Sequence, residues 1–317
     1  MQNDHQSLNA APVQSARIVV VGSVNMDLIF QLPRMPAPGE TLMGQSFHQI
    51  HGGKGANQAV AAARLGAHTT LLACVGDDDF ARSSVAALRD DGIDTSLVRQ
   101  VESCATGVAG ILLDAHGENS IVLAAGANAE LNTADIEKAR TIISQAQLLV
   151  CQLETPLASV RFAIEMAKSL GVKVILNPAP MQPLPTSLLA MIDYLVLNET
   201  EAEQLSGVKV ADTEAAMQAA QELCAKGVGT AIITMGGAGV VVVSKQESFS
   251  LPAYKVEVVD TTAAGDTFVG ALAVALGERQ DLKRACDFAQ KAAALAVTKL
   301  GAQTSIPHRA LVESHFH

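Results

Sequence analysis

Short apolar runs that alternate with helix-like stretches along most of the chain constrain the fold more than any other feature of the sequence. Each run is bounded by Gly, Pro, Asn or Asp, which is typical of buried strands. The expected strands are residues 17–22, 70–75, 148–153, 172–177, 194–198, 230–235 and 239–243. The expected helices are residues 56–65, 80–90, 133–144, 159–170, 199–205, 213–226 and 269–276. This alternation predicts right-handed βαβ units, and therefore a mostly parallel sheet with helices on both faces.

The composition suits a core of this kind. Hydrophobic residues make up 49% of the 317 residues, whereas aromatic residues make up 3% and Trp is absent. A core of Ala, Val, Leu and Ile fits parallel strands that helices cover on both faces. Thr133 and Thr213 are expected to cap the helices that they begin. We expect a single α/β domain over residues 16–317, after a loose polar tail over residues 1–15 that lacks the pattern of a signal peptide.

Two regions interrupt the alternation, at roughly residues 28–51 and 104–124. The first is rich in Pro and Gly and has no helical period, and the second contains two strand-like runs around a turn-prone His-Gly-Glu-Asn segment. Both patterns predict antiparallel strand pairs inserted into the α/β body. An additional small sheet would suit a lid that excludes water from an active site, a structural flap or a dimer surface.

Charge and cysteine content exclude several classes of protein. The formal net charge of −10 argues against nucleic acid and anionic membranes as partners. No apolar stretch approaches the ~20 residues of a membrane-spanning helix. The five cysteines are scattered without CxxC spacing, which indicates buried or free thiols in a reducing compartment. We therefore expect a cytoplasmic protein.

Polar residues follow several predicted strands at the edge where doubly wound sheets bind ligands. Asn25 and Asp27 follow the first strand, where they either face a polyol or form an ordinary turn. Glu154 follows the strand at 148–153, and an Asn-Pro-Ala-Pro segment follows the next strand. Asn198 and Glu201 form either a capping box at a helix start or a carboxylate site for Mg²⁺ held through water.

Two glycine-rich segments also border predicted strands or helices. The segment Gly-Gly-Lys-Gly-Ala-Asn-Gln at residues 52–58 opens a helix but matches neither the P-loop nor the GxGxxG pattern. Its glycines allow the backbone to approach a ligand closely, with Lys54 and Asn57 supplying polar groups. The segment Thr-Met-Gly-Gly-Ala-Gly at residues 234–239 leaves a strand and suits either a nucleotide or a hairpin turn.

The most informative motif is Asp-Thr-Thr-Ala-Ala-Gly-Asp-Thr-Phe at residues 260–268, followed by an apolar helix. Small residues before a helix leave its first N–H groups bare, which predicts an anion hole at Ala263, Ala264 and Gly265. Asp266 lies in the first helical turn, where it can accept a proton from an attacking hydroxyl during phosphoryl transfer. The alternative is an Asp that only stabilises the helix N-terminus, which leaves the preceding Ala-Ala-Gly unexplained.

Taken together, these motifs resemble those of the ribokinase-like carbohydrate kinase family, the phosphofructokinase B type, in the same order from about Arg17 to Pro307. The resemblance implies a three-layer α/β/α fold with a small inserted β-sheet lid, and a homodimer formed through that lid. It implies ATP-dependent phosphorylation of a sugar, with D-ribose phosphorylated at O5 favoured. Asn25 favours ribose over 2-deoxyribose, although 2-deoxyribose, other sugars and nucleosides remain alternatives.

The resemblance also implies a role for each site residue. Asp266 would be the catalytic base, beside an anion hole formed by Ala263, Ala264 and Gly265. The sugar would be bound by Asn25, Met26, Asp27, Gly53, Lys54, Gly55, Ala56, Asn57, Glu154 and Asp266. ATP would be bound by Asn198, Thr234, Met235, Gly236, Gly237, Ala238, Gly239, Gly265, Asp266 and Gln290. Glu201 would place Mg²⁺ through water, and K⁺ would lie among Asp260, Thr262, Ala296, Lys299, Gly301 and Ser305.

Some residues depart from the family pattern, and three other classes of function fit the sequence less well. Gly237 and Ala238 stand where a larger polar residue is expected, and Gln290 replaces a His or Asn. A dinucleotide-dependent oxidoreductase would need GxGxxG, which is missing. A non-catalytic sugar-binding module would have no use for a base in an anion hole. A zinc enzyme would need a third ligand beside His48 and His51, which are interpreted as surface or lid histidines.

Overall fold

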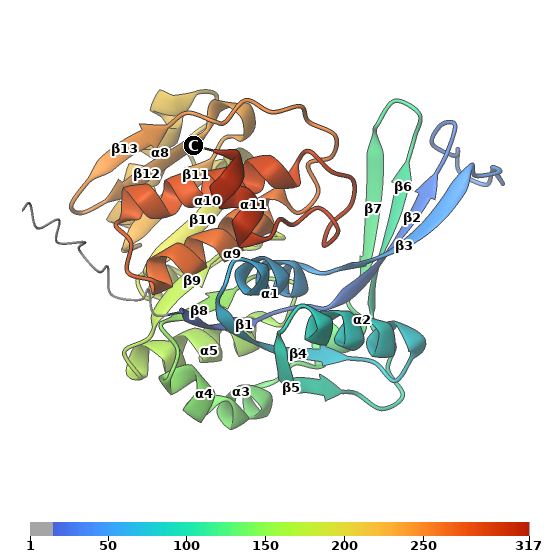
Figure 1. Ribbon diagram of the computed structural model, residues 1–317, viewed down its shortest axis with the longest axis horizontal. Coiled ribbons are helices and arrows are strands. Elements are labelled where there is room, and N and C mark those ends of the chain that lie inside the picture. The colour runs from blue at the N-terminus through green and yellow to red at the C-terminus, as the bar shows by residue number, and fades with distance from the viewer. Residues whose placement is uncertain (1–14, 317) are drawn as a thin grey trace, which may run out of the picture.

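A nine-stranded sheet forms the centre of the computed structural model, which describes residues 15–316 (Figure 1). Its strands are β1 (Arg17–Val21), β4 (His68–Val75), β5 (Asp94–Gln100), β8 (Leu148–Cys151), β9 (Lys173–Leu176), β10 (Tyr194–Asn198), β11 (Thr230–Thr234), β12 (Val240–Ser244) and β13 (Ser248–Leu251). They lie in the order β13-β12-β11-β10-β9-β8-β1-β4-β5. All neighbours pair in parallel except β11 with β12 and β12 with β13, which are antiparallel.

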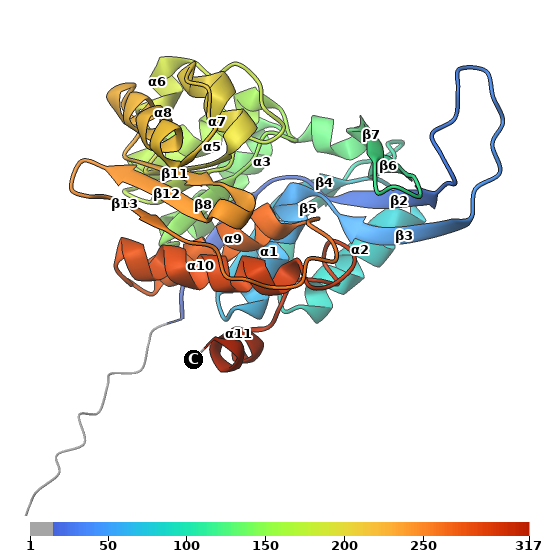
Figure 2. The same ribbon diagram turned by 90° about the horizontal axis from the view of Figure 1, so that it is seen from above.

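Helices cover both faces of this sheet, which confirms the predicted three layers (Figure 2). One face carries α1 (Lys54–Arg64), α2 (Asp79–Asp90), α9 (Ala264–Gly277), α10 (Leu282–Ala296) and α11 (Arg309–His315). The other carries α3 (Thr133–Lys138), α4 (Arg140–Ser144), α5 (Leu157–Ser169), α6 (Thr186–Leu189), α7 (Glu199–Ser206) and α8 (Thr213–Ala225). Alternate side chains of β1 pack into the two cores, Ile18 and Val20 into the first and Val19 and Val21 into the second.

Helices α1 and α9 pack unusually closely, and this positions the site described below. A Cβ on Gly270 of α9 would lie 2.5 Å from the Cβ of Ala61 and 2.8 Å from the carbonyl oxygen of Gln58, both in α1. Only glycine allows this approach. Helix α9 is buried along most of its length. Asn57 and Gln58 of α1 donate to Asp266 of α9, so the N-terminal turn of α9 lies beside the first residues of α1.

The predicted insertions form a second sheet, which we call the lid sheet. Its strands are β2 (Asn25–Gln31), β3 (Ser46–Gly52), β6 (Gly107–Leu113) and β7 (Asn119–Ala124), in the order β3-β2-β6-β7. Each insertion is an antiparallel pair, as predicted, and β2 and β6 join the pairs in parallel. The first insertion begins earlier than predicted, since Asn25 and Asp27 lie in β2 and not in a turn after β1.

Several local predictions were wrong. The helix caps are Asn132 and Asp212, whose side chains accept backbone N–H groups of α3 and α8, so Thr133 and Thr213 are the first helical residues. Asn and Asp cap at least as well as Thr, and the preceding residue therefore takes the cap position. The helix predicted over 133–144 is divided into α3 and α4 at Ala139. The elements not predicted are β5, β13, α6, α10 and α11.

The tail predicted over residues 1–15 lies outside the described residues except for Ser15, whose hydroxyl donates to the carbonyl oxygen of Gly66. Between residues 15 and 316, no helix combines the length and the apolar character needed to cross a membrane.

Candidate active site

Two adjoining cavities open where the central strands end. The larger cavity has a volume of about 570 Å³ and extends from the loop after β11 to α10. The smaller cavity has a volume of about 460 Å³ and is bordered by the starts of α1, α7 and α9. Thr234, Gly236, Thr261 and Gly265 line both cavities, which therefore meet at the N-terminus of α9. Ligands of doubly wound sheets bind at this edge, as the sequence predicted.

Asp266 lies in the smaller cavity and is held by two side-chain amides from α1. Asn57 Nδ2 donates to Asp266 Oδ2 at 2.9 Å, and Gln58 Nε2 donates to Asp266 Oδ1 at 2.9 Å. The Asp266 side chain is only 7% exposed, so these donors define the plane of its carboxylate. Each oxygen keeps a lone pair that can accept a proton from a bound hydroxyl.

The N-terminus of α9 presents bare N–H groups beside this carboxylate. Ala263 precedes the helix in the left-handed region at φ 59° and provides no side-chain cap. Non-glycine residues rarely adopt this conformation, and they do so often at functional sites. The N–H groups of Gly265 and Asp266 have no hydrogen-bond partner between residues 15 and 316. This geometry can hold an anion. The sequence predicted an anion hole at Ala263, Ala264 and Gly265, whereas the Ala264 N–H donates to the Thr261 carbonyl oxygen at 3.2 Å.

Polar side chains from three elements converge beside Asp266. Asn25 and Asp27 share one face of β2, because they are two residues apart in a strand. Glu154 Oε2 accepts the Lys54 backbone N–H at 3.0 Å, which ties the loop after β8 to the start of α1. Asn57 Oδ1 is buried without a partner among the described residues, so it is free to accept a ligand hydroxyl.

Gly53 allows α1 to begin against the lid sheet. Its φ is 92°, and a Cβ there would lie 2.7 Å from the backbone nitrogen of Asn25. Both the left-handed conformation and the close approach require glycine. Gly53 therefore brings the α1 N-terminus against the first residues of β2. The sequence predicted that these glycines serve the approach of a ligand, whereas at Gly53 the close approach is to protein backbone.

Charged side chains around Asp266 perturb each other's pKa values. Burial, and to a lesser extent the nearby Glu154 and Asp266, raise the pKa of Asp27 to about 7 against the opposing effect of Lys54. Burial alone would lower the pKa of Lys54, but the surrounding carboxylates, Asp266 first, raise it. Burial also raises the pKa of Glu201, against a hydrogen bond from the Asn198 backbone and the charge of Lys54. Lys54 is thus the positive charge that this group of carboxylates shares.

We expect the ligand-free Asp27→Asn variant to gain stability over the wild type as pH rises from 5 to 8. The folded-state pKa of Asp27, about 7, lies above its ordinary value of 3.8. The stability that Asp27 contributes is therefore full below about pH 4 and is lost as pH rises through 7. The free-energy difference between variant and wild type should change by on the order of 2 kcal/mol over this range, measured by urea unfolding. A pH-independent difference between variant and wild type would contradict the buried-carboxylate account.

The larger cavity combines apolar walls with one free donor. Its lining includes Val256, Phe268 and Ala293. Gln290 on α10 is 8% exposed, and its Nε2 has no partner in the described part of the chain. A Cβ on Gly237 would meet no atom within 4 Å, so the small residues after β11 leave space in this cavity.

Some predicted ligand residues line neither cavity, and these include the predicted sugar contacts Asn25, Asp27, Gly53, Asn57 and Glu154. Met235 packs in the core between the sheet and α7 and α8, and Met26 is buried at the base of the lid sheet. Gly55 and Ala56 are also fully buried in α1. Their backbones border the site, whereas the methionine side chains are directed into packed regions.

Asn198 and Glu201 form the capping box that the sequence left as an alternative. Asn198 Oδ1 accepts the Glu201 N–H at 2.8 Å, and Glu201 Oε2 accepts the Asn198 N–H at 3.0 Å. Both residues also line the smaller cavity. The second carboxylate oxygen of Glu201 is not used by the cap, so capping does not exclude binding to a hydrated cation.

The residues predicted for a monovalent cation gather between two turns. Asp260 Oδ1 accepts the N–H and hydroxyl of Thr262, and Asp260 Oδ2 accepts the Gly301 N–H at 2.8 Å. Burial opposes these hydrogen bonds, which nevertheless lower the pKa of Asp260. Ser305, four residues after Gly301 in the sequence, is buried, whereas Lys299 is exposed. Because the Asp260 carboxylate already has three donors, a cation here would need backbone carbonyl oxygens.

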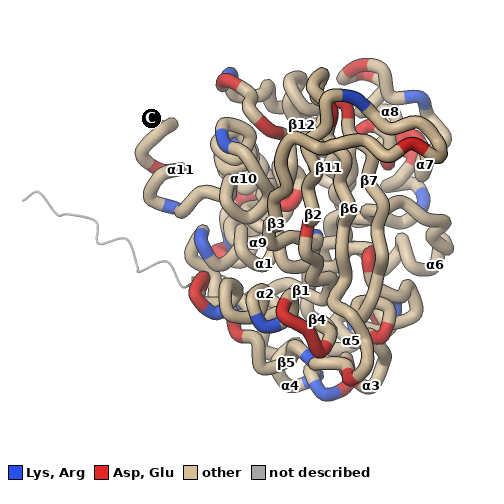
Figure 3. Tube along the Cα trace, turned by 90° about the vertical axis from the view of Figure 1, so that its right-hand side faces the viewer, with Lys and Arg blue, Asp and Glu red and all other residues tan. Residues whose placement is uncertain are grey.

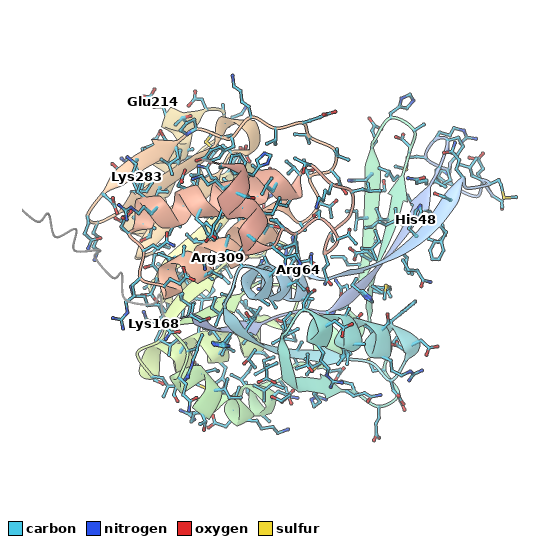
Figure 4. The ribbon with its side chains drawn as sticks, in the orientation of Figure 1. His48, Arg64, Lys168, Glu214, Lys283 and Arg309 are labelled. Atoms are coloured by element: carbon cyan, nitrogen blue, oxygen red, sulfur yellow. The ribbon has the colours of Figure 1, made fainter. Side chains whose placement is uncertain are left out.

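The two histidines considered as zinc ligands contact different residues. His48 lies on the lid sheet (Figure 4) and contacts the hydroxyl of Ser46. His51 contacts Ser83 and Ser84 of α2. Across residues 15–316, no cluster of three or more His, Cys, Asp or Glu side chains suits a metal ion. The prediction of lid histidines is confirmed.

Sequence reasoning missed four buried residues that organise the site, namely Ser23, Gln58, Asn128 and Gln152. Asn128 accepts the Val24 N–H at 2.9 Å and donates to Asn25 Oδ1 at 2.7 Å. Ser23 donates to Glu154 Oε2 at 2.5 Å and accepts the Gly55 N–H. Gln58 and Gln152 stood within segments already singled out, but nothing local marked Asn128.

Comparison with known proteins agrees with this geometry. The sequence pattern of the pfkB family carbohydrate kinases matches residues 15–309. Ribokinase from Haemophilus influenzae is 47% identical over 292 residues, which cover 92% of this chain and 95% of the relative. A deoxyribokinase from Salmonella typhi is 41% identical over 291 residues, with coverage of 92% and 95%.

A solved structure gives the same result. Arabidopsis thaliana ribokinase, complexed with ribose and ATP, superposes with a TM-score of 0.88 at 34% identity, covering 95% of this chain and 98% of that one. The layered sheet with its lid is therefore a ribokinase-like α/β fold, as expected. Matches of this extent, together with the cavities at the N-terminus of α9, show that the chain belongs to the pfkB family of carbohydrate kinases.

Proposed function

We propose that this protein transfers the γ-phosphoryl group of ATP to O5 of D-ribose, giving D-ribose 5-phosphate and ADP. One observation carries the proposal. The Asp266 carboxylate lies beside the bare N–H groups of α9, at the point where an apolar cavity meets a polar one. The names of the relatives, ribokinases from several organisms, supply the sugar and the nucleotide.

The proposed mechanism follows from the positions of these groups. The ribose hydroxyl attacks the γ-phosphorus while its proton passes to a carboxylate oxygen of Asp266, and the bond to the β-phosphate oxygen breaks. The charge on the transferred group is stabilised by the N–H groups of Gly265 and Asp266 and by the Lys54 ammonium. Each such donor is typically worth about 100-fold or more in rate, because it is preorganised in a site that excludes water.

The sugar is proposed to bind among Asn25, Asp27, Asn57 and Glu154. Carboxylate and amide oxygens in this cluster outnumber the donors, which suits a ligand made of hydroxyl groups. Asn57 Oδ1 supports this proposal most directly, because it is buried and has no partner within the described residues. The adenine and ribose of ATP would then occupy the larger cavity, with Gln290 Nε2 as a donor.

Two cations complete the proposal. Mg²⁺ would be held chiefly by phosphate oxygens and water, with Glu201 in the smaller cavity as its contact to the protein. K⁺ would lie beside Asp260 and Thr262, coordinated mainly by backbone carbonyl oxygens. When bound, Mg²⁺ neutralises phosphate charge, and K⁺ braces the turn that precedes the bare N–H groups.

The test is ADP release from MgATP with a panel of sugars and nucleosides, in K⁺ and again in Na⁺. We expect turnover with D-ribose, at least about tenfold weaker turnover with 2-deoxyribose because Asn25 loses a hydroxyl partner, and a higher rate in K⁺. Preference for 2-deoxyribose would move the chain to the activity named for the Salmonella typhi relative. No turnover with any compound of the panel would overturn the proposal.

A cytoplasmic location is also proposed.

The protein is further proposed to form a homodimer through the lid sheet. Phe30 and Phe47 pack against each other across β2 and β3 with ring centroids 4.8 Å apart, and both are exposed. Val122 of β7 is 73% exposed, and few charged residues lie on the lid sheet (Figure 3). Light scattering should return twice the monomer mass of 32.9 kDa, and Val122→Asp should return the monomer mass. A monomeric wild type at micromolar concentration would contradict the dimer.

A further inference from the structure

We propose that Gln58 and Gln152 form a directional amide relay that keeps Asp266 a hydrogen-bond acceptor, which makes both glutamines positioning residues for phosphoryl transfer. The inference rests on the proposed function in treating Asp266 as the base. Gln152 lies after β8 and Gln58 in α1, and both side chains are fully buried. Neither glutamine lines either cavity, and neither is among the side chains proposed to bind the sugar.

The relay is a continuous chain of hydrogen bonds. Gln152 Nε2 donates to Gln58 Oε1 at 2.6 Å. Gln58 Nε2 then donates both to Asp266 Oδ1 at 2.9 Å and to Asn177 Oδ1 at 3.2 Å. Asn177 Nδ2 in turn donates to the carbonyl oxygen of Val196 in β10 at 3.1 Å. The chain thus links α1, β10 and α9 with the segments that follow β8 and β9.

The direction of every bond is determined by the ends of the chain. A carboxylate and a backbone carbonyl can only accept, so Asp266 and Val196 orient Gln58 and Asn177. Both protons of Gln58 Nε2 are then committed, which leaves Gln58 Oε1 to be satisfied by Gln152. If the Gln58 amide were reversed, its oxygen would face the oxygens of Asp266 and Asn177 with no proton between them, at a cost of about 1–3 kcal/mol per unpaired group.

The burial of Gln152 leaves one of its two polar atoms without a hydrogen bond to any of residues 15–316, so the position is costly for a glutamine. Gln152 Oε1 has no partner in the described residues, so an apolar side chain at this position would avoid the burial of an unpaired oxygen. Gly22 leaves room for the Gln152 side chain, because a Cβ on Gly22 would lie 2.1 Å from Gln152 Oε1. The contribution of Gln152 is the hydrogen bond that its Nε2 donates to Gln58 Oε1.

The orientation of Gln58 controls the position of the Asp266 carboxylate, the proposed base. With Gln58 oriented as a donor, Asp266 Oδ1 is fixed in place, and the carboxylate remains in the plane set by Gln58 and Asn57. If Gln58 presented its oxygen instead, the carboxyl group would have to bind a proton or rotate away. Either change removes the base from the attacking hydroxyl. Gln152 therefore acts on catalysis through Gln58, without contact with either substrate.

The test compares Gln58→Glu, Gln152→Glu and Gln152→Met in ribose-dependent ADP release between pH 5.5 and 9.5. Gln58→Glu places a second carboxylate against Asp266, so we expect kcat to fall at least about 100-fold near pH 7, with the acid limb of the profile moved upward by at least about one pH unit and partial recovery at pH 9. Gln152→Glu reverses the relay from a distance and should give the same change to a smaller degree. Gln152→Met removes the donor to Gln58 Oε1 without reversing the relay, so kcat should fall, although less than in Gln152→Glu, and the pH profile should keep its wild-type shape.

The KM values for ribose and ATP should change less than about threefold in all three variants, because the relay lies outside the binding cavities. A wild-type profile in both glutamate variants, or equal effects of Gln152→Glu and Gln152→Met, would overturn the relay and reduce Gln152 to a packing residue. If Gln58→Glu does not fold, the pair of Gln152 variants decides.

The two proposals can fail separately. If the wild type shows no ribose-dependent turnover, the proposed function fails, and the relay is then judged in protein labelled with ¹³C at the aspartate carboxyl groups. The Asp266 signal, assigned by its loss in Asp266→Asn, should titrate at higher pH in Gln152→Glu than in Gln152→Met. Identical titration in these two variants would overturn the relay whatever the substrate.

Discussion

Replacing Asp266 with Asn should lower kcat by about a thousandfold or more while leaving the fold and ATP binding intact. The amide cannot take the proton of the attacking hydroxyl. It also brings an NH₂ group against one of two donors, Asn57 Nδ2 or Gln58 Nε2, each 2.9 Å from the carboxylate. We therefore expect a modest loss of thermal stability beside the large loss of turnover, measured by steady-state kinetics, calorimetric ATP titration and thermal unfolding.

Two further variants separate catalysis from helix capping. Asp266→Ala removes the carboxylate without creating a donor–donor contact, and it should lose turnover to a similar degree. Asp212→Asn changes another Asp at a helix N-terminus, where the side chain accepts the Ala215 N–H, and it should keep full activity. Near-normal turnover in both Asp266 variants would show that this residue only stabilises α9, which is the simpler alternative that the sequence allowed.

Local patterns in the sequence predicted the layers but not the neighbours within the sheet. The alternation of apolar runs and helices gave most strands and the position of helices on both faces. It could not show that β1 lies between β8 and β4, because strand order depends on packing between residues distant in sequence. Helix α10 was overlooked although its buried face is regular, whereas β5 and β13 lack the continuous apolar run by which strands were recognised.

The site was predictable where its residues adjoin one helix start or one strand end. Residues 52–58 and 260–268 each contain a local motif, and α1 and α9 bring both motifs together. Asn25 was expected after the first strand but lies in β2, which pairs with β3 and β6, segments distant from it in sequence. Asn128 was missed because it lies 103 residues from Asn25. The raised pKa of Asp27 likewise depends on burial and charges supplied by distant segments.

Gly265→Ala should lower kcat by at least about 100-fold without destabilising the protein, because it blocks an anion site built of backbone N–H groups. Gly265 has no positive φ, and an added Cβ would meet no protein atom within 4 Å. Alanine is also the better helix former by about 1 kcal/mol. The methyl group would nevertheless stand at the junction of the two cavities, where a phosphoryl oxygen must approach the N–H groups within about 3 Å.

The matched control is Gly110→Ala in β6, where the nearest atom to an added Cβ is 3.8 Å away, and Gly110 lines neither of the two cavities. This variant should keep turnover, whereas Gly265→Ala should unfold at the wild-type temperature or above and yet fail to release ADP at the wild-type rate. Loss of stability together with activity would indicate a packing defect instead. Normal turnover in a folded Gly265→Ala protein would mean that the charge of the transferred phosphoryl group is stabilised elsewhere, leaving Lys54 as the principal candidate, because it is the charge that the surrounding carboxylates share.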